Sequence, residues 1–225
     1  HATCYSWIAY QTAYLKANYP PQYMAACMSR NISNITEITK LMDECRAMGI
    51  QTLGPDVNES ILKFSVNSKG DIRFGLGAIK GVGENAVQSI VEERQSNGPY
   101  EGIFDFVQRV NLSACNRKTM ENLTLSGAFD NFRELNREQY FVMNDRGEVF
   151  MDSLLRYGIR YQQDKHASQN SLFGDDNPIE IATPEIFPAE SWSNLEKLNK
   201  ERDLVGMYLS AHPLDEYTVV LENIC

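Results

Sequence analysis

The residues best suited to chemistry are four glycines within the stretch GLGAIKGVG, residues 75–83. Glycines this closely spaced usually let backbone N–H groups approach a ligand, and that ligand is often phosphate. Residues 84–96 follow with a helical pattern, so the N–H groups at the start of that helix are left without partners. The stretch therefore predicts a phosphate-binding turn, for either a nucleotide cofactor or a nucleic-acid backbone.

A nucleotide cofactor is the first alternative. The spacing of Gly77, Gly81 and Gly83 matches that of short-chain dehydrogenases, and Tyr161 and Lys165 match their Tyr-x-x-x-Lys pair. A dinucleotide site needs a buried parallel strand directly before the glycines and repeated strand–helix units after them. The preceding DIRF is short and charged, and no apolar strand pattern follows. On a helix, Tyr-x-x-x-Lys is more often a pair of exposed neighbours, so an NAD(P)-dependent dehydrogenase is only a remote alternative.

A nucleic-acid backbone fits the residues better. The stretch AIKGVGENAVQSI has the pattern of a helix-hairpin-helix motif, in which a short helix and a tight glycine turn precede a second helix. We name residues 76–84 the first hairpin. We expect both turn glycines to relieve steric limits, Val82 to point back into the core, and the lysine to add charge beside the free amides. The predicted DNA contacts are Lys80, Gly81, Val82, Gly83 and Glu84.

A weaker copy of this pattern follows in NRKTMENLTLSGAFDNF. A helix over 116–125 leads into a second hairpin at Ser126, Gly127 and Ala128, with Arg117 and Lys118 as its positive charges. Two hairpins predict a tandem unit that grips the two strands of a duplex through phosphate, without reading base sequence. The alternative for both copies is an ordinary packing joint between helices.

A third motif lies in residues 166–191, which lose periodicity, gain proline and are predicted to be a linker. Leu172 and Phe173 leave apolar surface in water unless something covers them. With Gln169 they resemble the pentapeptide by which bacterial replication proteins bind the sliding clamp. Burying two such side chains contributes roughly 3 to 6 kcal/mol before ordering costs, which predicts an exchangeable tether. The alternative is that both side chains pack on this protein's own surface.

Charge and cysteine content further limit the kinds of protein that this chain can be. The chain of 225 residues has a net charge of −9. Residues 166–225 hold 3 Lys and Arg against 11 Asp and Glu, whereas residues 1–165 hold 18 against 19, so the first part can still present a basic face. Five scattered cysteines without a C-x-x-C pair predict reduced thiols in the cytoplasm rather than disulfides or zinc. No apolar run approaches the ~20 residues that span a bilayer, and the chain, which starts without Met, is expected to be a piece of a longer protein.

The expected fold is mainly α with a small β element, an α+β class. Helices are predicted over 2–48, with a break at the two prolines and a stop at Gly49, and short strands are predicted in IQTL and on both sides of a turn in KFSVNSKGDIRF. Further helices are expected over 84–96, 103–110, 116–125, 135–165 with an interruption at 144–147, and 193–209.

Five longer stretches carry a resemblance to a known family: HATCYSWIAYQTAYLKANYPPQYMAACM, GIQTLGPDVNES, IRFGLGAIKGVGENAV, SGAFD and LVGMYLSAHPLDEY. In this order they resemble the alpha subunits of bacterial DNA polymerase III, the replicative C-family polymerases, over essentially the whole chain. The departures are modest: Gln22 and Tyr23 stand where Glu and Phe are usual, and Ser126 stands where Ala is common.

The resemblance implies a domain organisation and a role. Residues 1–75 look like the C-terminal part of the fingers domain, 76–165 like a tandem helix-hairpin-helix DNA-binding domain, 166–191 like a linker with the clamp-binding peptide, and 192–225 like a helical connection toward an OB-fold that is absent. The family's palm aspartates, which hold Mg²⁺, are also absent. The resemblance thus implies a non-catalytic segment of a DNA-directed DNA polymerase, with no catalytic residue, metal ligand or cofactor of its own.

The partners implied are primer–template duplex DNA, the sliding clamp and other replicase subunits, with no membrane. A helix-hairpin-helix repair enzyme such as a glycosylase is the other functional class. That class needs a catalytic Lys in the hairpin region or an Asp in a recognisable downstream motif, and neither is found in the sequence.

Overall fold

Three helices form the N-terminal part of the chain. The computed structural model describes residues 1–170 and 181–209, and it begins with α1 (Ala2–Asn18), α2 (Pro20–Arg30) and α3 (Ile35–Ala47). α1 ends where Pro20 follows, because proline fits the first turn of a helix but not its interior. α3 starts after Asn34, whose side chain accepts a hydrogen bond from the Glu37 N–H, and ends before Gly49, which has φ +72°. The predicted breaks are confirmed.

The predicted β element is a sheet of three two-residue strands, β1 (Thr52–Leu53), β2 (Ser65–Val66) and β3 (Ile72–Arg73). The central strand β3 pairs parallel with β1 and antiparallel with β2. α2 packs against β2 and β3 and buries Met24 and Met28 completely. The α+β class is therefore confirmed, and this sheet is too small to be that of a dinucleotide-binding domain.

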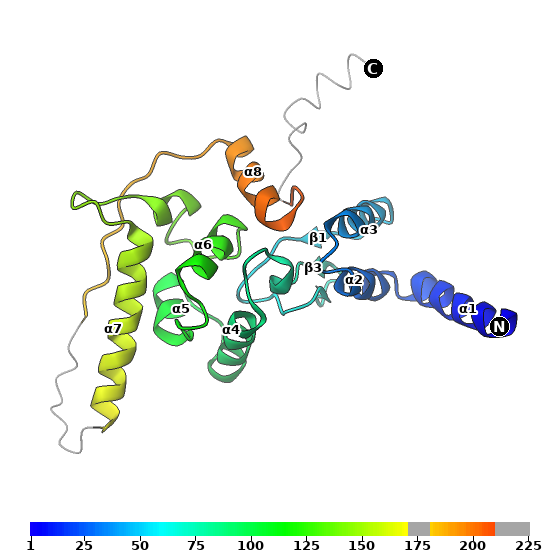
Figure 1. Ribbon diagram of the computed structural model, residues 1–225, viewed down its shortest axis with the longest axis horizontal. Coiled ribbons are helices and arrows are strands. Elements are labelled where there is room, and N and C mark those ends of the chain that lie inside the picture. The colour runs from blue at the N-terminus through cyan, green and yellow to red at the C-terminus, as the bar shows by residue number, and fades with distance from the viewer. Residues whose placement is uncertain (171–180, 210–225) are drawn as a thin grey trace, which may run out of the picture.

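The remaining helices follow the glycine turn. They are η1 (Leu76–Ala78), α4 (Glu84–Asn97), α5 (Ile103–Arg109), α6 (Arg117–Leu125), η2 (Arg137–Phe141), α7 (Phe150–Asn170) and α8 (Asn194–Val205), where η marks a 3₁₀ helix. α7 lies along one side of the molecule, against α5, and α1 projects from the opposite end (Figure 1). Among the described residues, no helix is both long enough and apolar enough to cross a bilayer.

A row of buried aromatic rings joins α5, the second hairpin and α7. Phe106 lies 5.1 Å from Phe129 between ring centroids, and Phe129 lies 6.1 Å from Tyr140. Tyr140 in turn lies 6.2 Å from Phe150, the first residue of α7. The hairpin region is thus held by a core that spans most of its length.

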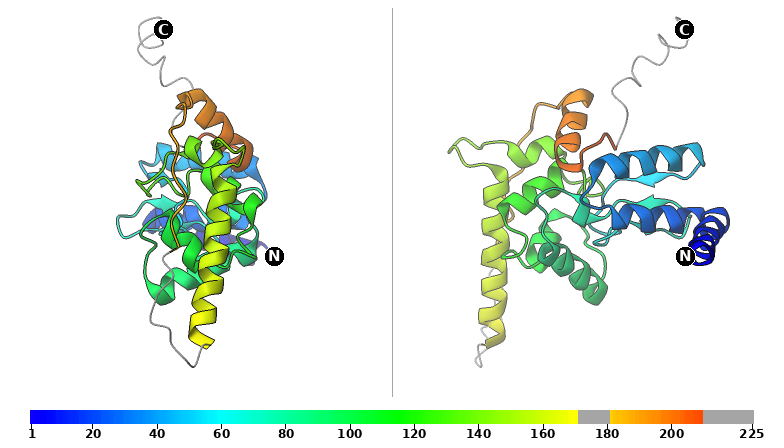
Figure 2. Two further views of the ribbon diagram at one scale, coloured as in Figure 1. Left: turned by 90° about the vertical axis from the view of Figure 1, so that its left-hand side faces the viewer. Right: turned by 45° about the vertical axis from the view of Figure 1, so that its right-hand side comes forward.

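Two helix ends differ from the sequence expectation. The stretch 135–165 is interrupted as expected, by a loop that the bridge between Met143 and Val149 closes. α7 continues to Asn170, five residues into the predicted linker. α8 ends at Val205 rather than at 209, because Gly206 adopts φ +81° and stops the helix. After residue 181 the chain runs back beside α7 and reaches α8, which packs on α6 (Figure 2).

Candidate nucleic-acid interface

The first hairpin has the predicted shape. η1 leads into a turn in which Gly81 has φ +76°, and a Cβ at that position would lie 2.5 Å from Nδ2 of Asn122. Glycine is therefore required here, both by the backbone angle and by the close approach of α6. The Val82 N–H donates to the Ile79 carbonyl at 3.1 Å, and the Val82 side chain is buried. Its predicted role as an apolar plug is confirmed.

Gly83 differs from the expectation, because the fold itself does not need a glycine there. Its φ of −76° suits any residue, and a Cβ at this position would have no neighbour within 4 Å. The missing side chain instead leaves the start of α4 open. The N–H groups of Gly83, Glu84 and Asn85 donate to no described residue. An open helix N-terminus with unpaired amides and the positive end of the helix dipole can hold an anion.

Lys80 is fixed through its backbone and exposed at its side chain. Its N–H donates to the Leu204 carbonyl at 2.9 Å, and its own carbonyl accepts from Nδ2 of Asn122 at 2.8 Å. Within the described part of the chain, its ammonium group forms no ion pair. Glu84 is exposed in the first turn of α4, and it can meet phosphate only through its N–H, since its carboxylate would repel the anion.

The second hairpin does not present free amides. Gly127 has φ +86°, but the N–H groups of Ser126, Gly127 and Ala128 donate to Asn122, Thr124 and Leu123 at 3.0, 3.1 and 2.9 Å. These bonds close the C-terminus of α6. All three residues are buried. The expectation that this turn offers amides to phosphate is therefore wrong, because its donors already have partners and no helix begins directly after it.

Arg137 covers the second hairpin. A Cβ on Gly127 would collide with its guanidinium, which donates to Asp130 at 2.8 Å and to Glu201 at 2.8 Å. It also donates to the Leu125 carbonyl at 3.3 Å. Burial alone would lower the pKa of Arg137, but the two carboxylates outweigh it and raise the pKa. Sequence reasoning missed this residue, because nothing in local spacing pairs it with a glutamate 64 positions away.

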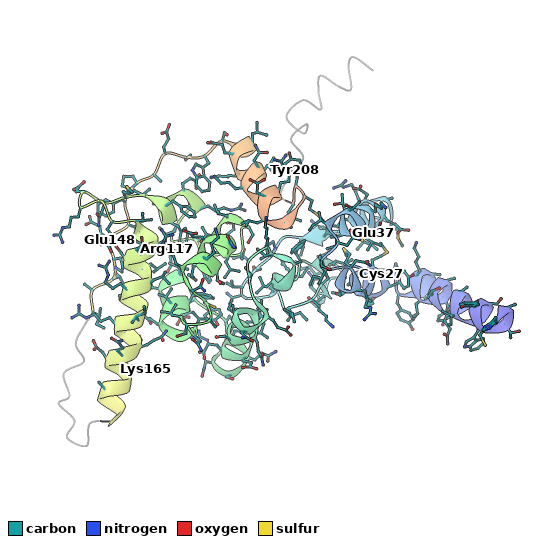
Figure 3. The ribbon with its side chains drawn as sticks, in the orientation of Figure 1. Cys27, Glu37, Arg117, Glu148, Lys165 and Tyr208 are labelled. Atoms are coloured by element: carbon teal, nitrogen blue, oxygen red, sulfur yellow. The ribbon has the colours of Figure 1, made fainter. Side chains whose placement is uncertain are left out.

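Arg117 and Lys118 begin α6, and their charges differ in availability. Arg117 donates to Asp152 of α7 at 2.6 Å and also pairs with Glu121. The Lys118 ammonium is 3.6 Å from Glu121, with 73% of the side chain exposed. Lys165 lies at the other end of α7 from Arg117 (Figure 3). Lys118 is therefore the more available of the two predicted cations.

The predicted clamp peptide is described only in part. The backbone of Gln169 lies in the last turn of α7. Leu172 and Phe173 lie outside the described residues. The structure therefore leaves their role as a prediction.

Two aspartates that could be considered as catalytic or metal-binding residues instead accept hydrogen bonds from the backbone of neighbouring residues. Asp56 accepts from the Asn58 N–H at 2.7 Å, and Asp105 accepts from the Glu101 N–H at 3.0 Å. No group of three or more His, Cys, Asp or Glu within 1–170 and 181–209 is arranged to hold a metal ion. Burial raises the pKa of the Cys115 thiol to about 12, so this cysteine is unsuited to nucleophilic chemistry.

Comparison with known proteins agrees with this geometry. The sequence profile of the helix-hairpin-helix motif matches residues 49–140, which contain both hairpins and the small sheet. The region is thus a helix-hairpin-helix unit, and the match begins well before residue 76, where the sequence predicted its boundary.

The relatives extend over the whole chain. DNA polymerase III subunit alpha of Neisseria meningitidis is 41% identical over 224 residues, which is 100% of this chain and 19% of that protein. The corresponding subunits of Vibrio cholerae and Escherichia coli are 35% and 34% identical over 96% and 99% of the chain, and 18% and 19% of their own lengths. The chain belongs to the DNA polymerase III alpha-subunit family and spans about a fifth of the length of these relatives.

Proposed function

We propose that this chain is a non-catalytic segment of a replicative DNA polymerase that binds the backbone of duplex DNA. The observation that carries the proposal is the open start of α4, where Gly83 leaves three amides uncovered beside the exposed Lys80. Such a site binds phosphate without reading bases. By the same proposal, Mg²⁺ and catalysis belong to the palm of the parent polymerase, because the metal-binding aspartates of the family match no residue of this sequence.

Gly83→Val is the sharpest test of DNA binding. A valine fits the backbone at φ −76° and meets no neighbour within 4 Å, so the fold should be unchanged while the branched side chain covers the amides. We expect the affinity for a short mixed-sequence duplex to fall by about tenfold or more, as loss of hydrogen bonds to a charged group predicts. Fluorescence anisotropy at low salt measures this change.

Gly54→Val is the matched control. Gly54 likewise has open space around its Cβ position and lacks a positive φ, but it lies in the loop after β1. The Gly54→Val variant should bind the duplex with the same affinity as the parent chain. Equal affinities of all three chains would refute the proposed interface, and so would strong preference for one base sequence. Base excision by the chain would favour the repair class instead.

We further propose that the segment tethers the polymerase to the sliding clamp through Gln169, Leu172 and Phe173. The support is the sequence pattern Q-x-x-L-F, which begins at the end of α7. Leu172→Ala combined with Phe173→Ala should abolish clamp affinity in a titration and leave duplex affinity intact. Ile186→Ala, which removes another exposed apolar side chain downstream, is the control. Unchanged clamp binding of the double variant would end this proposal.

A further inference from the structure

α8 contacts the first hairpin and the arginine that covers the second, although it lies far from both in sequence. A capping box between Ser193 and Glu196 starts this helix. Leu198, Glu201 and Val205 are its buried residues, and they face the body of the molecule. Figure 1 shows α8 above α6, between the hairpin region and the N-terminal helices.

The contact with the first hairpin is a backbone hydrogen bond. The Lys80 N–H donates to the Leu204 carbonyl in the last turn of α8 at 2.9 Å. A carbonyl in that turn has no intrahelical partner of its own, so it is free to accept. Together with Asn122, which donates to the Lys80 carbonyl at 2.8 Å, α8 fixes the peptide groups on both sides of the lysine directly before the glycine turn.

The contact on the side of the second hairpin is a buried ion pair with Arg137, the η2 residue that covers this turn. Glu201 is 1% exposed and accepts from Arg137 at 2.8 Å, and the Arg137 side chain is 11% exposed. Arg137 also binds Asp130 and the Leu125 carbonyl at the end of α6. A buried carboxylate is held strongly by such a partner, because an unpaired charge in this position is costly.

The segment before α8 is attached as well. The Trp192 N–H donates to Glu138 at 2.9 Å, and the Lys197 ammonium lies 3.1 Å from the same carboxylate. The Trp192 ring stacks on Phe141, with 5.7 Å between the ring centroids, and the Lys200 ammonium lies over the Trp192 ring at 4.4 Å from its centroid. These contacts bring α8 onto η2 and the second hairpin in one orientation.

From these contacts we infer that α8 is a positioning element for DNA binding, with Glu201 and Arg137 as its positioning residues. The Arg137–Glu201 pair holds α8 in place, and α8 in turn fixes Lys80 and the turn of the first hairpin. Neither residue touches DNA. The inference rests on the proposed function for its DNA readout, but its first readout is independent of DNA.

The first readout is hydrogen exchange at the Lys80 amide. Glu201→Ala should release α8 and speed exchange at this amide by about tenfold or more, since breaking a buried pair opens the local structure. Amides in the interior of α4, such as that of Ile90, should keep their rates. Asp203→Ala is the matched control, because this α8 carboxylate is 73% exposed and is paired with Arg202, whereas Arg137 is paired with Glu201.

A second variant covers the case in which Glu201→Ala unfolds other parts of the protein besides α8. Gly206→Ala places a side chain against Ile35 at φ +81° and displaces the end of α8 without changing charge. It should also speed exchange at Lys80. Glu201→Gln, which keeps an acceptor for Arg137, should restore part of the protection. Unchanged exchange at Lys80 in both Glu201→Ala and Gly206→Ala would overturn the inference.

The second readout is duplex binding. Both variants should weaken affinity by about fivefold, in the range of ordinary coupling between sites, and saturating duplex should slow exchange in α8 by linkage. Faster exchange at Lys80 with unchanged duplex affinity would refute the positioning role. Absence of duplex binding by the parent chain would instead refute the proposed function, and the exchange result would still report on whether α8 holds the hairpin.

Discussion

The first and second hairpins both turn on a glycine with positive φ, at +76° for Gly81 and +86° for Gly127, yet their surroundings are opposite. Gly81 is exposed and leads into an open helix start, whereas Gly127 is buried beneath Arg137. One glycine turn therefore presents amides to solvent and the other closes a helix end. The same local turn leaves amides exposed or becomes part of the core according to what packs over it.

The largest expected effect is a loss of stability when the arginine over the second hairpin is removed. Arg137→Ala removes the guanidinium that pairs with Asp130 and with the buried Glu201, and breaking such a buried pair should cost about 3 to 5 kcal/mol in the free energy of unfolding. Urea denaturation measures this loss. Lys80→Ala, on the exposed first hairpin, is the control and should change stability by less than about 0.5 kcal/mol. Similar losses for both variants would mean that the two hairpins do not differ in burial.

Gly81→Val and Gly83→Val separate the two roles of glycine within the first hairpin. Valine at φ +76° is strained and approaches Asn122, so Gly81→Val should lower the free energy of unfolding by about 2 kcal/mol. Gly83→Val should leave it nearly unchanged. Thermal unfolding of the two variants gives the comparison, and a destabilised Gly83→Val would show that its site is not open.

Lysine substitutions compare the two hairpins in DNA binding. Lys80→Ala should reduce the slope of log affinity against log salt by about 1, because one phosphate contact is lost. Lys118→Ala should change the slope less, since this ammonium lies near Glu121. Anisotropy titrations over a salt series measure both slopes. An equal effect of the two lysines would place both hairpins on the duplex.

The smallest effect concerns acid stability beside the second hairpin. Burial would raise the pKa of Glu138, but hydrogen bonds from its own N–H and from Trp192, together with Lys197, outweigh it and lower the pKa. Its stabilising contribution is therefore complete above its ordinary pKa of 4.5 and is lost as pH falls through the lowered folded value. Glu138→Gln should flatten this part of the stability–pH curve, measured by denaturation from neutral to acid pH. An unchanged curve would contradict the shift.

Local signals predicted the elements of this fold but not their contacts. Pro20, the Asn34 cap and the glycines of the first hairpin act on their neighbours in the chain, so spacing alone located them. The end of α7 was misplaced because no Gly or Pro follows until after Asn170. The bond between Asn122 and Lys80 joins residues 42 positions apart and fixes the peptide group directly before the first glycine turn. The spacing of neighbouring residues cannot predict contacts between residues this far apart in the sequence.

α1 has a practical consequence for work on the isolated chain. None of its residues is buried, and Tyr5, Trp7 and Tyr10 are between 63% and 70% exposed. Apolar surface on this scale favours self-association in water. Its main attachments are α2 and one ion pair from Lys16 to Glu44. A shortened chain that starts at Tyr19 would therefore keep both hairpins and stay monodisperse at the concentrations that binding titrations require.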